Sequence, residues 1–268
     1  MDLSIIILNY KAKGLLKQCL KGIELVKPAL DFEVIVVDNA SGDGSIDMVK
    51  EQFPWVKLIE NPYNTGYAAG NNVAIRQAQG KYVMILNPDI TILNQSIMEL
   101  YHFMEKNPKA GLIGPKLINP DGSTQMSCRR FPTIKTIIYR RTPLGKLPGA
   151  QKLLKRFLMI DWEHRDAKQV DWLLGACLFT KREAINKVGL LDERFFLYFE
   201  DVDWCRRFWQ AGYKVYYLPQ AEMVHYHRRL SAINPGFKGV FGYATRLHIV
   251  SGIKYFTKYF SSKDIIHD

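Results

Sequence analysis

The chain has 268 residues, a formal net charge of +11, 47% hydrophobic residues and 24% charged residues. This length allows one large α/β domain or two small ones, with a core that needs neither disulfides nor a structural metal. The four cysteines form no CxxC pair, which favours a reduced, cytoplasmic protein over a secreted, disulfide-rich one. No basic-then-apolar leader precedes the first strand pattern, and no stretch approaches the roughly 20 apolar residues that span a bilayer. We therefore expect neither a signal peptide nor a transmembrane helix.

Much of the positive charge lies between Gly122 and Ile160, a segment that contains no acidic residue. Apolar residues such as Phe131, Leu153 and Phe157 are interspersed with the basic ones. Three interpretations remain open: a solvated basic face, a surface for anionic lipid or a diphosphate-bearing ligand, and a nucleic-acid surface, for which no recognised motif is present. The nine basic residues are Arg129, Arg130, Lys135, Arg140, Arg141, Lys146, Lys152, Lys155 and Arg156.

Strand-like and helix-like patterns alternate through the first half of the chain. This alternation predicts parallel strands with right-handed crossovers, and the near-continuous apolar strands predict a sheet that is covered on both faces. In such sheets, ligands bind at the carboxyl ends of strands, where the strand order reverses. The expected strands are 3–8, 32–37, 56–59 and 82–86, and the expected helices are 15–26, 45–53, 68–78 and 95–106.

The second half of the chain is more mixed. We expect a strand at 173–180, a short helix from Lys181 and a helix at 201–211 that Gly212 can end. Near the carboxyl terminus, apolar residues at spacings of three and four predict an amphipathic helix. Its apolar stripe could pack on the rest of the protein or lie on a membrane. The stripe consists of Tyr243, Leu247, Val250, Ile253, Phe256 and Phe260.

Asp38 closes the second expected strand, in the sequence Val-Val-Asp-Asn-Ala-Ser. Its carboxylate could simply cap the next turn, or it could accept a hydrogen bond from a pyrimidine imide or a ribose hydroxyl. A polar, glycine-bearing loop at 61–72 runs into a helix, and free N–H groups at a helix start favour anions. Neither a GxGxxG dinucleotide motif nor a GxxxxGK phosphate loop is present.

Asp89 follows the fourth expected strand, in the sequence Asn-Pro-Asp. Pro88 stops the strand and projects Asp89 at its tip. A carboxylate in that position could form a turn, or it could hold Mg²⁺ or Mn²⁺, which bind oxygen ligands and bridge to diphosphates.

Glu200 and Asp201 stand at the start of an expected helix, where acidic residues are also favoured by the helix dipole. The aromatic residues around them, Trp204 included, could flank a sugar, and a carboxylate in a partly apolar cleft can act as a general base. His225, on a strand-like stretch, is either a structural histidine or a further metal ligand, and a histidine ligand leans toward Mn²⁺.

In their order and spacing, these motifs resemble the inverting family 2 glycosyltransferases with a GT-A fold, particularly the bacterial rhamnosyltransferase-like branch. The resemblance runs from residue 4 to about residue 231. It implies that Asp201 is the catalytic base and that Asp89 and His225 bind the metal. Asn87 replaces the first acid of the family's DxD motif, and the stretch 227–231 lacks the glycine that is common in the family. The substrate-binding residues that it implies are Leu8, Asn9, Tyr10, Asp38, Asn64, Gly70, Asn71, Asn87, Gly175, Ala176, Glu200 and Trp204.

The resemblance also implies a reaction. A sugar, with L-rhamnose as the first candidate, would move from a dTDP- or UDP-linked donor to a hydroxyl of a saccharide or polyprenyl-diphosphate-linked acceptor in cell-surface polysaccharide synthesis. The transfer would require Mn²⁺ or Mg²⁺. The protein would be cytoplasmic and bound peripherally to the inner face of an anionic membrane. Nucleic acid is not expected as a partner. The expected GT-A catalytic domain is 1–231, with a nucleotide-binding half at about 1–118, a basic insert at about 122–168 and an acceptor-side half at about 170–231. A helical tail at 232–268 would follow.

Two alternatives remain open. One is a catalytically inactive, membrane-associated protein that binds nucleotide sugar, because the altered DxD motif weakens the metal site. The other is a sugar-phosphate nucleotidylyltransferase. Such enzymes carry a glycine-rich basic loop after the first strand, where this chain has Asn-Tyr-Lys-Ala-Lys-Gly at 9–14.

Overall fold

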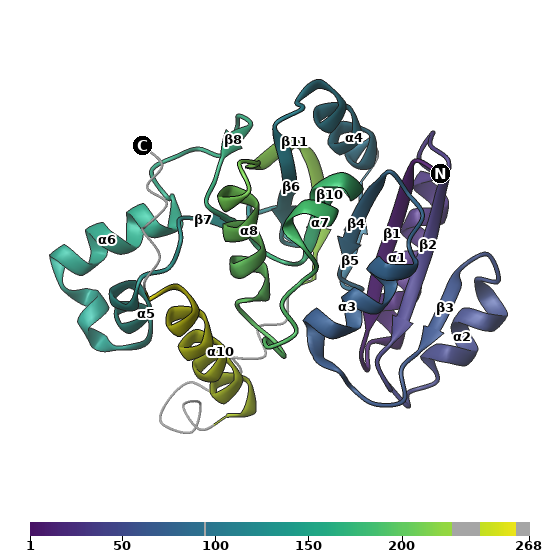
Figure 1. The fold of residues 1–268 in the computed structure, drawn as a ribbon, viewed down its shortest axis with the longest axis horizontal. Coiled ribbons are helices and arrows are strands. Elements are labelled where there is room, and N and C mark those ends of the chain that lie inside the picture. Colours follow the sequence, from purple (N-terminus) through teal and green to yellow (C-terminus); the bar gives the residue numbers. More distant parts are fainter. Residues whose placement is uncertain (94, 227–241, 261–268) are drawn as a thin grey trace.

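The computed structural model describes residues 1–93, 95–226 and 242–260, except for the side chain of Arg141. Within these residues, a nine-stranded sheet forms the centre of the molecule, in the order β3-β2-β1-β4-β10-β6-β11-β5, with β8 paired to β11 (Figure 1). A short separate sheet joins β7 (Cys128–Arg129) to β9 (Trp172–Leu173). The strands of the large sheet are β1 (Leu3–Asn9), β2 (Phe32–Asp38), β3 (Lys57–Glu60), β4 (Tyr82–Leu86), β5 (Ile90–Ile92), β6 (Ala110–Ile118), β8 (Lys168–Gln169), β10 (Cys177–Lys181) and β11 (Lys214–His225).

The sheet is mostly parallel, as the alternating pattern predicts. Strand β1 pairs in parallel with β2 and β4, β2 pairs in parallel with β3, and β11 pairs in parallel with β6. Strand β10 runs antiparallel between β4 and β6. The α/β fold class with a mostly parallel sheet is therefore confirmed.

Helices cover both faces of the sheet. One hydrophobic cluster lies under α1 (Lys13–Val26), α2 (Ser45–Gln52) and α4 (Ser96–Lys106). The cluster on the other face lies under α3 (Gly66–Gln77), α7 (Arg182–Val188) and α8 (Glu200–Gln210). Alternate strand residues feed the two clusters: Ile5 and Ile7 point into the first and Ile6 into the second, as expected for a strand buried on both faces.

Two strand expectations differ from the structure. The expected strand at 173–180 is divided into β9 and β10, which belong to different sheets, and the chain turns between them at 174–176. The pattern did not predict β6, because its sequence, Ala-Gly-Leu-Ile-Gly-Pro-Lys-Leu-Ile, contains two glycines and a proline, which normally weaken a strand.

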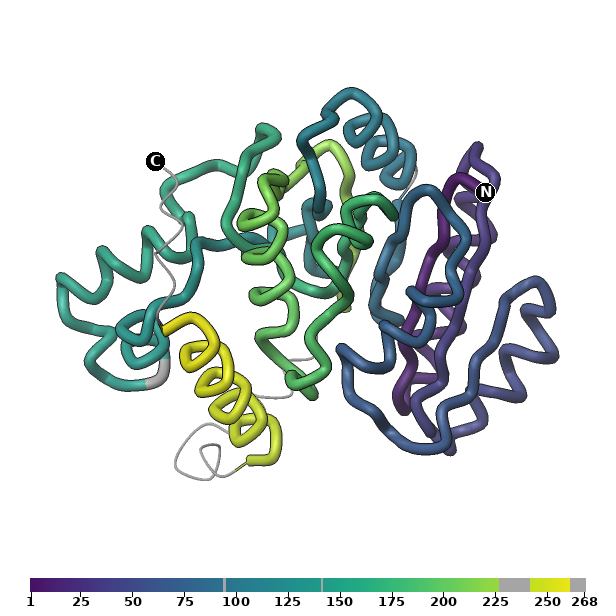
Figure 2. Tube along the Cα trace, in the orientation of Figure 1, coloured from purple at the N-terminus to yellow at the C-terminus, as the bar shows by residue number. Residues whose placement is uncertain are grey.

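The basic segment folds into α5 (Ile134–Arg141), the 3₁₀ helix η1 (Pro143–Lys146) and α6 (Pro148–Leu158). These helices lie at the end of the molecule that is opposite β3 and α2 (Figure 1). Helix α10 (Tyr243–Tyr259) lies beside them in the trace of Figure 2. Phe157 of α6 and Tyr255 of α10 belong to the same hydrophobic cluster, which also includes residues of α8. The basic segment and α10 are thus joined to the main sheet through α8.

The predicted carboxyl-terminal helix is present as α10, but only part of its apolar stripe is packed. Phe256 packs against the hydrophobic cluster and lies 6.3 Å from the Phe199 ring, between centroids, whereas Tyr243, Val250 and Ile253 are 71%, 46% and 62% exposed. The packed face also carries Ser251, Gly252 and Tyr255, and the small Ser251 and Gly252 allow a close approach to the loop before α8. The last residue of the stripe, Phe260, is 89% exposed.

Among the helices that the structure describes, none combines the length and the hydrophobicity that crossing a bilayer requires.

Candidate functional site

The carboxyl ends of β1 and β2 hold the first polar group of the site. The two strands pair with Asn9 opposite Asp38, and both side chains are almost fully buried. Asn9 Nδ2 donates to Asp38 Oδ2 at 2.8 Å and to Ser41 Oγ at 3.0 Å. The Ser41 backbone N–H donates to Asp38 Oδ1 at 2.8 Å, which is a turn-capping contact. The Asp38 carboxylate is therefore fixed at the end of the sheet.

A network of amide side chains holds the polar loop that precedes α3. Asn39 Oδ1 accepts hydrogen bonds from Asn61 Nδ2 at 3.0 Å and from the Thr65 backbone N–H at 3.1 Å. Asn39 Nδ2 donates to Asn64 Oδ1 at 2.8 Å, and Asn64 Oδ1 also accepts from the Gly66 N–H at 2.9 Å. Asn64 thus orders the loop that enters α3, next to Asp38.

Helix α3 lies close to β1. A Cβ atom added to Gly70 would lie 2.5 Å from Leu8 Cδ1, so a larger residue there would displace the Leu8 side chain. Asn71 is fully buried and its Nδ2 donates to the Tyr67 carbonyl at 2.9 Å, while its Oδ1 accepts no hydrogen bond from the described residues. Tyr10, by contrast, is 45% exposed at the rim.

Asp89 and His225 face each other across the start of β5 and the end of β11. Asp89 Oδ1 lies 3.4 Å from His225 Nε2 and accepts no hydrogen bond within the described part of the chain. His225 Nδ1 is paired with Gln125 Oε1 at 2.8 Å, and Gln125 Nε2 donates to the His225 carbonyl at 2.9 Å. Just before Asp89, the Asn87 N–H donates to the Ala176 carbonyl at 2.8 Å, which links this turn to the segment before β10.

Asp201 is held at the start of α8 by the backbone. Its Oδ2 accepts from the Gly175 N–H at 2.9 Å and its Oδ1 from the Val202 N–H at 2.8 Å. Burial raises the pKa of Asp201, while these backbone bonds, the Trp172 indole and the positive charge of Arg129 oppose that rise. The Arg129 guanidinium lies over the Trp172 ring, 4.8 Å from its centroid. Asp201 is thus a buried carboxylate with its orientation set by two N–H groups.

Glu200 differs from Asp201 in its partners. Burial, followed by the neighbouring charge of Asp201, raises the pKa of Glu200 well above its usual range. Its Oε2 accepts no hydrogen bond within the described residues. The two carboxyl groups titrate as a pair, and the two backbone N–H donors favour the charged form of Asp201, whereas Glu200 Oε2 has no such donor among the described residues.

Tyr67 links the separate parts of the site. Its hydroxyl donates to the Gly175 carbonyl, and burial raises its pKa well above the usual range. The charges of Glu200, Asp201 and Asp89 raise that pKa further, in decreasing order. The turn at 175–176 therefore joins Tyr67, Asp201 and, through Asn87, the turn that carries Asp89.

Trp204 lies elsewhere. It is fully buried in the cluster beneath α8, and its Nε1 donates to the Gly189 carbonyl at 2.9 Å, so its surroundings are those of a core residue. The turn into α8 carries two consecutive left-handed residues, Tyr198 (φ 69°) and Phe199 (φ 70°). The His248 ring of α10 packs on both, with ring centroids 5.1 Å from each. Strained backbone of this kind occurs where surrounding packing holds a functional segment.

Sequence reasoning missed four residues of this arrangement: Tyr67, Gln125, Arg129 and Trp172. Tyr67 stood within a motif already selected but was not given a role. Arg129 was counted only as part of the basic segment. Gln125 is 100 residues from its partner His225 and lies in no recognisable motif.

Comparison with known proteins gives the family. The family model described as "Glycosyl transferase family 2" matches residues 4–161. The chain is 29% identical over 221 residues to an N-acetylglucosaminyl-diphospho-decaprenol L-rhamnosyltransferase of Mycobacterium tuberculosis, a match that covers 75% of this chain and 69% of that protein. It is 26% identical over 202 residues to the rhamnosyltransferase WbbL of Escherichia coli K12, a match that covers 69% of this chain and 72% of WbbL.

Solved structures share the fold. GalNAc-T7 with UDP, GalNAc and Mn²⁺ has a TM-score of 0.64 and 17% identity, and the match covers 85% of this chain but only 44% of that one. A mannosyltransferase of Pyrobaculum calidifontis in complex with GDP-Man and Mn²⁺ has a TM-score of 0.58 and 17% identity, and the match covers 98% of this chain and 76% of that one. Because the family model matches residues 4–161 and the solved GT-A glycosyltransferases share the fold, this chain belongs to glycosyltransferase family 2.

Proposed function

We propose that this glycosyltransferase moves a sugar, with inversion at the anomeric carbon, from a nucleoside-diphosphate donor to a hydroxyl group of a saccharide or lipid-linked saccharide. One observation carries the proposal: Asp201 is buried, is oriented by the Gly175 and Val202 N–H groups, and is linked through the turn at 175–176 to Asn87, two residues before Asp89. Such an arrangement suits a general base close to a diphosphate-binding end of the sheet.

The proposed chemistry is a direct displacement. Asp201 takes the proton of the acceptor hydroxyl while the hydroxyl oxygen forms a bond to the anomeric carbon. The bond between that carbon and the diphosphate breaks, and the nucleoside diphosphate leaves from the opposite face. Each Asp201 oxygen accepts one backbone N–H and keeps lone-pair capacity for the incoming hydroxyl. Within the pair, Asp201 is the proposed base, because two backbone N–H groups favour its charged form.

The proposed metal ion is Mn²⁺ or Mg²⁺, and the residues present fit it in part. Asp89 Oδ1 is buried without a hydrogen-bond donor among the described residues, as expected of a ligand atom, and Gln125 orients the imidazole of His225. The described residues contain no group of three or more histidine, cysteine and acidic side chains that could hold a metal. Asp89 and His225 would therefore supply only part of the coordination, with phosphate oxygens and water completing it. A bound ion would offset the charge that develops on the departing diphosphate.

The proposed substrates follow the relatives. The Mycobacterium tuberculosis relative and WbbL are rhamnosyltransferases by name, so L-rhamnose is the proposed sugar, with dTDP as the first candidate carrier and UDP as the second. The name of the mycobacterial relative contains N-acetylglucosaminyl-diphospho-decaprenol, which supports a polyprenyl-diphosphate-linked acceptor for this chain. The proposed process is cell-surface polysaccharide synthesis.

We also propose that the protein binds the inner face of an anionic membrane from the cytoplasm. Basic side chains are concentrated in α5 and α6, and apolar side chains are exposed on the same segment. Ile134 is 57% exposed and Leu147 is 55% exposed, and Ile253 on neighbouring α10 is 62% exposed. Mixed basic and apolar surfaces of this kind bind anionic bilayers.

The experiment that tests the proposed function is a calorimetric titration of dTDP and UDP, each with Mn²⁺, with Mg²⁺ and with EDTA. We expect one nucleotide to bind in a metal-dependent manner to the wild type and much more weakly to Asp89→Ala. Hydrolysis of the matching nucleotide sugar by the wild type would separate an active enzyme from an inactive binding protein. Absence of nucleotide binding under every condition would contradict the proposal.

A further inference from the structure

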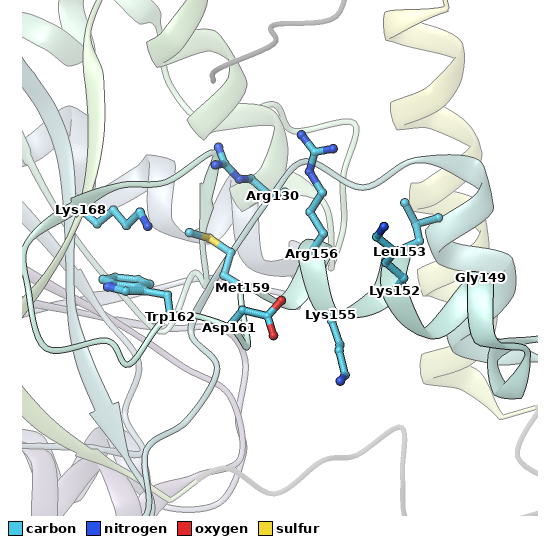
Figure 3. A pocket seen from close by; sticks show the side chains of 10 residues that line it. All are labelled: Arg130, Gly149, Lys152, Leu153, Lys155, Arg156, Met159, Asp161, Trp162 and Lys168. Carbon is cyan, nitrogen blue, oxygen red and sulfur yellow. The ribbon is translucent and has the colours of Figure 1, made fainter.

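A cavity that Asp201 does not line lies in the basic segment. It has a volume of about 610 Å³ and lies between α6 and the chain at 159–168 (Figure 3). This volume is within the range of ordinary small-molecule sites. We call it the α6 hollow. Neither Asp89 nor His225 lines it, so it is distinct from the proposed metal site.

The α6 hollow is strongly basic. Its lining contains five basic side chains and one acidic side chain, Asp161. Figure 3 shows Lys168 on one side of the hollow and the α6 residues on the other. Like charges that share a hollow repel each other, and a bound anion would remove that repulsion. The basic residues are Arg130, Lys152, Lys155, Arg156 and Lys168.

Within the described residues, the basic side chains of α6 are not neutralised by acidic partners. Lys152, Lys155 and Arg156 form no ion pair with an acidic residue in the described ranges, whereas Arg130 donates to Asp171 at 3.1 Å. The Asp171 contact fixes the Arg130 guanidinium at one edge of the hollow while leaving its other N–H groups available. A guanidinium next to lysine ammonium groups matches the oxygens of a phosphate group.

The rest of the lining is apolar. Leu153, Met159 and Trp162 line the hollow, and Lys168 Nζ lies over the Trp162 ring at 4.9 Å from its centroid. Just outside the lining, Ile160 is 46% exposed. A highly polar inorganic ion would gain nothing from these side chains, whereas an anion with an attached hydrocarbon chain would contact both kinds of lining.

The α6 hollow is connected to the site of Asp201 by one short strand. Consecutive residues of a strand point to opposite sides, and β7 ends in Arg129 and is followed directly by Arg130. Arg129 stacks on Trp172 and its charge acts on Asp201, while Arg130 lines the hollow. A molecule bound in the hollow is therefore held by the same segment that borders the proposed base.

We infer that the α6 hollow binds the diphosphate group of a polyprenyl-diphosphate-linked acceptor. The phosphate oxygens pair with Arg130, Arg156 and Lys152, and the first part of the hydrocarbon chain contacts Leu153 and Met159. The identity of the lipid rests on the proposed function. The binding of a diphosphate group does not, because it follows from the charge and the lining of the hollow.

The test compares two double variants with equal loss of charge. Lys152→Gln with Arg156→Gln changes the lining of the hollow, and Lys135→Gln with Lys146→Gln changes exposed residues of the same basic segment that do not line it. The first probe is inorganic pyrophosphate, titrated by calorimetry in EDTA so that no divalent ion is available. We expect the hollow variant to weaken binding about tenfold or more and the control variant to change it by less than about twofold.

The second probe separates the two lipid sources of phosphate. Co-sedimentation is measured with phosphatidylcholine vesicles that contain geranylgeranyl diphosphate, and with phosphatidylcholine vesicles that contain phosphatidylglycerol at equal surface charge. The inference is supported if the hollow variant loses more vesicle binding than the control variant does, and if this difference is seen with the diphosphate vesicles and not with the phosphatidylglycerol vesicles. If the hollow variant loses vesicle binding equally on both vesicle types, the inference is overturned in favour of a site for phospholipid headgroups.

Unchanged pyrophosphate binding in the hollow variant would also overturn the inference. Metal-dependent titration of dTDP and UDP on the same variants keeps this outcome separate from the proposed function. Loss of pyrophosphate binding with normal nucleotide binding locates the effect in the hollow. If the wild type binds pyrophosphate but no nucleotide, the anion site in the hollow is supported and the proposed glycosyl transfer is contradicted.

Discussion

Two regions of the site are assembled in different ways. At the ends of β1 and β2, Asn9 and Asp38 meet because they are partners in adjacent parallel strands. At the start of α8, Asp201 is held by Gly175, which lies 26 residues earlier in a turn between two different sheets. We call the first the strand-end region and the second the helix-start region. The sheet itself positions the strand-end region, whereas the helix-start region depends on contacts between segments that are separate in sequence.

This difference has a functional consequence. The strand-end region is a rigid extension of the sheet core, which is the place where α/β proteins bind nucleotides. The helix-start region includes left-handed residues at Tyr198 and Phe199 and is supported from outside by α10, whose Ser251 Oγ donates to the Leu197 carbonyl at 2.8 Å. The proposed chemistry thus depends on the region with the less direct support, and substitutions there should affect turnover more than nucleotide binding.

The largest expected effect comes from Asp201→Asn. The amide cannot take the acceptor proton, so kcat should fall by about 10²- to 10⁴-fold. The dissociation constant for the nucleoside diphosphate should stay within about twofold of wild type, because the strand-end region is unchanged. Steady-state kinetics together with calorimetry measures both quantities.

Glu200→Gln is the matched control for that experiment. Burial raises the pKa of Glu200 well above its usual range, and its Oε2 accepts no hydrogen bond within the described residues, so a neutral amide should be tolerated and kcat should change by less than about tenfold. Full activity in Asp201→Asn, or an equal loss in both variants, would remove Asp201 from its assigned role.

The next effect concerns the support of His225. Gln125→Leu removes the partner of His225 Nδ1, which lies 2.8 Å away, and leaves the imidazole without that orientation. Partners of this kind are typically worth about 10- to 100-fold in metal affinity, so Mn²⁺-dependent nucleotide binding should weaken by that factor. Gln169→Leu, at an exposed position of β8, serves as the control and should leave the binding unchanged. Equal binding in Gln125→Leu and wild type would contradict a metal-ligand role for His225.

These two regions also show what the sequence could predict. The alternation of strands and helices is a local pattern, and it correctly placed Asp38 at the end of β2 and Asp89 in the turn that follows β4. No local pattern records that Gln125 meets His225, because that contact arises only when β11 pairs with β5 and β6. The place of Trp172 in the site could not be predicted for the same reason, since the strand pattern does not indicate that the chain turns at 174–176 between two sheets.

The packed face of α10 could not be predicted for another reason, which concerns side-chain size and not sequence separation. Periodicity selected the residues that include Val250 and Ile253, because they are the larger apolar ones. Of that stripe the structure packs Phe256, and it also packs α10 through Gly252, where an added Cβ would already lie 3.4 Å from the Phe199 ring. Close contact between a helix and a loop favours small residues, which an apolar periodicity does not register.

A smaller effect is expected at the loop of the strand-end region. Gly66 has φ +83°, and an added Cβ would lie 2.7 Å from Phe196 Cδ2, so Gly66→Ala should destabilise the protein by about 1–3 kcal/mol. Gly22→Ala is the opposite control: apart from the neighbouring residues and the helix backbone, no atom of the described residues lies within 4 Å of an added Cβ, and an alanine within α1 should stabilise by about 0.5–1 kcal/mol. Urea unfolding of both variants measures the difference. If Gly66→Ala lowers the free energy of unfolding no more than a substitution at an exposed surface position does, the loop adjusts freely to the added methyl group.

The smallest expected effect is a shift of a pH profile, and it distinguishes two neighbouring arginines. The positive charge of Arg129 lowers the pKa of Asp201, so Arg129→Gln should raise that pKa. A general base must be deprotonated, and activity therefore falls as the pH drops below its pKa. The acidic limb of kcat/KM should move to higher pH in Arg129→Gln, by up to about one unit, with little change on the plateau. Arg130→Gln removes an equal charge on the opposite side of the strand, where the guanidinium pairs with Asp171, and should leave the limb in place. A limb that moves to lower pH, or that moves equally in both variants, would show that Arg129 does not act on the base.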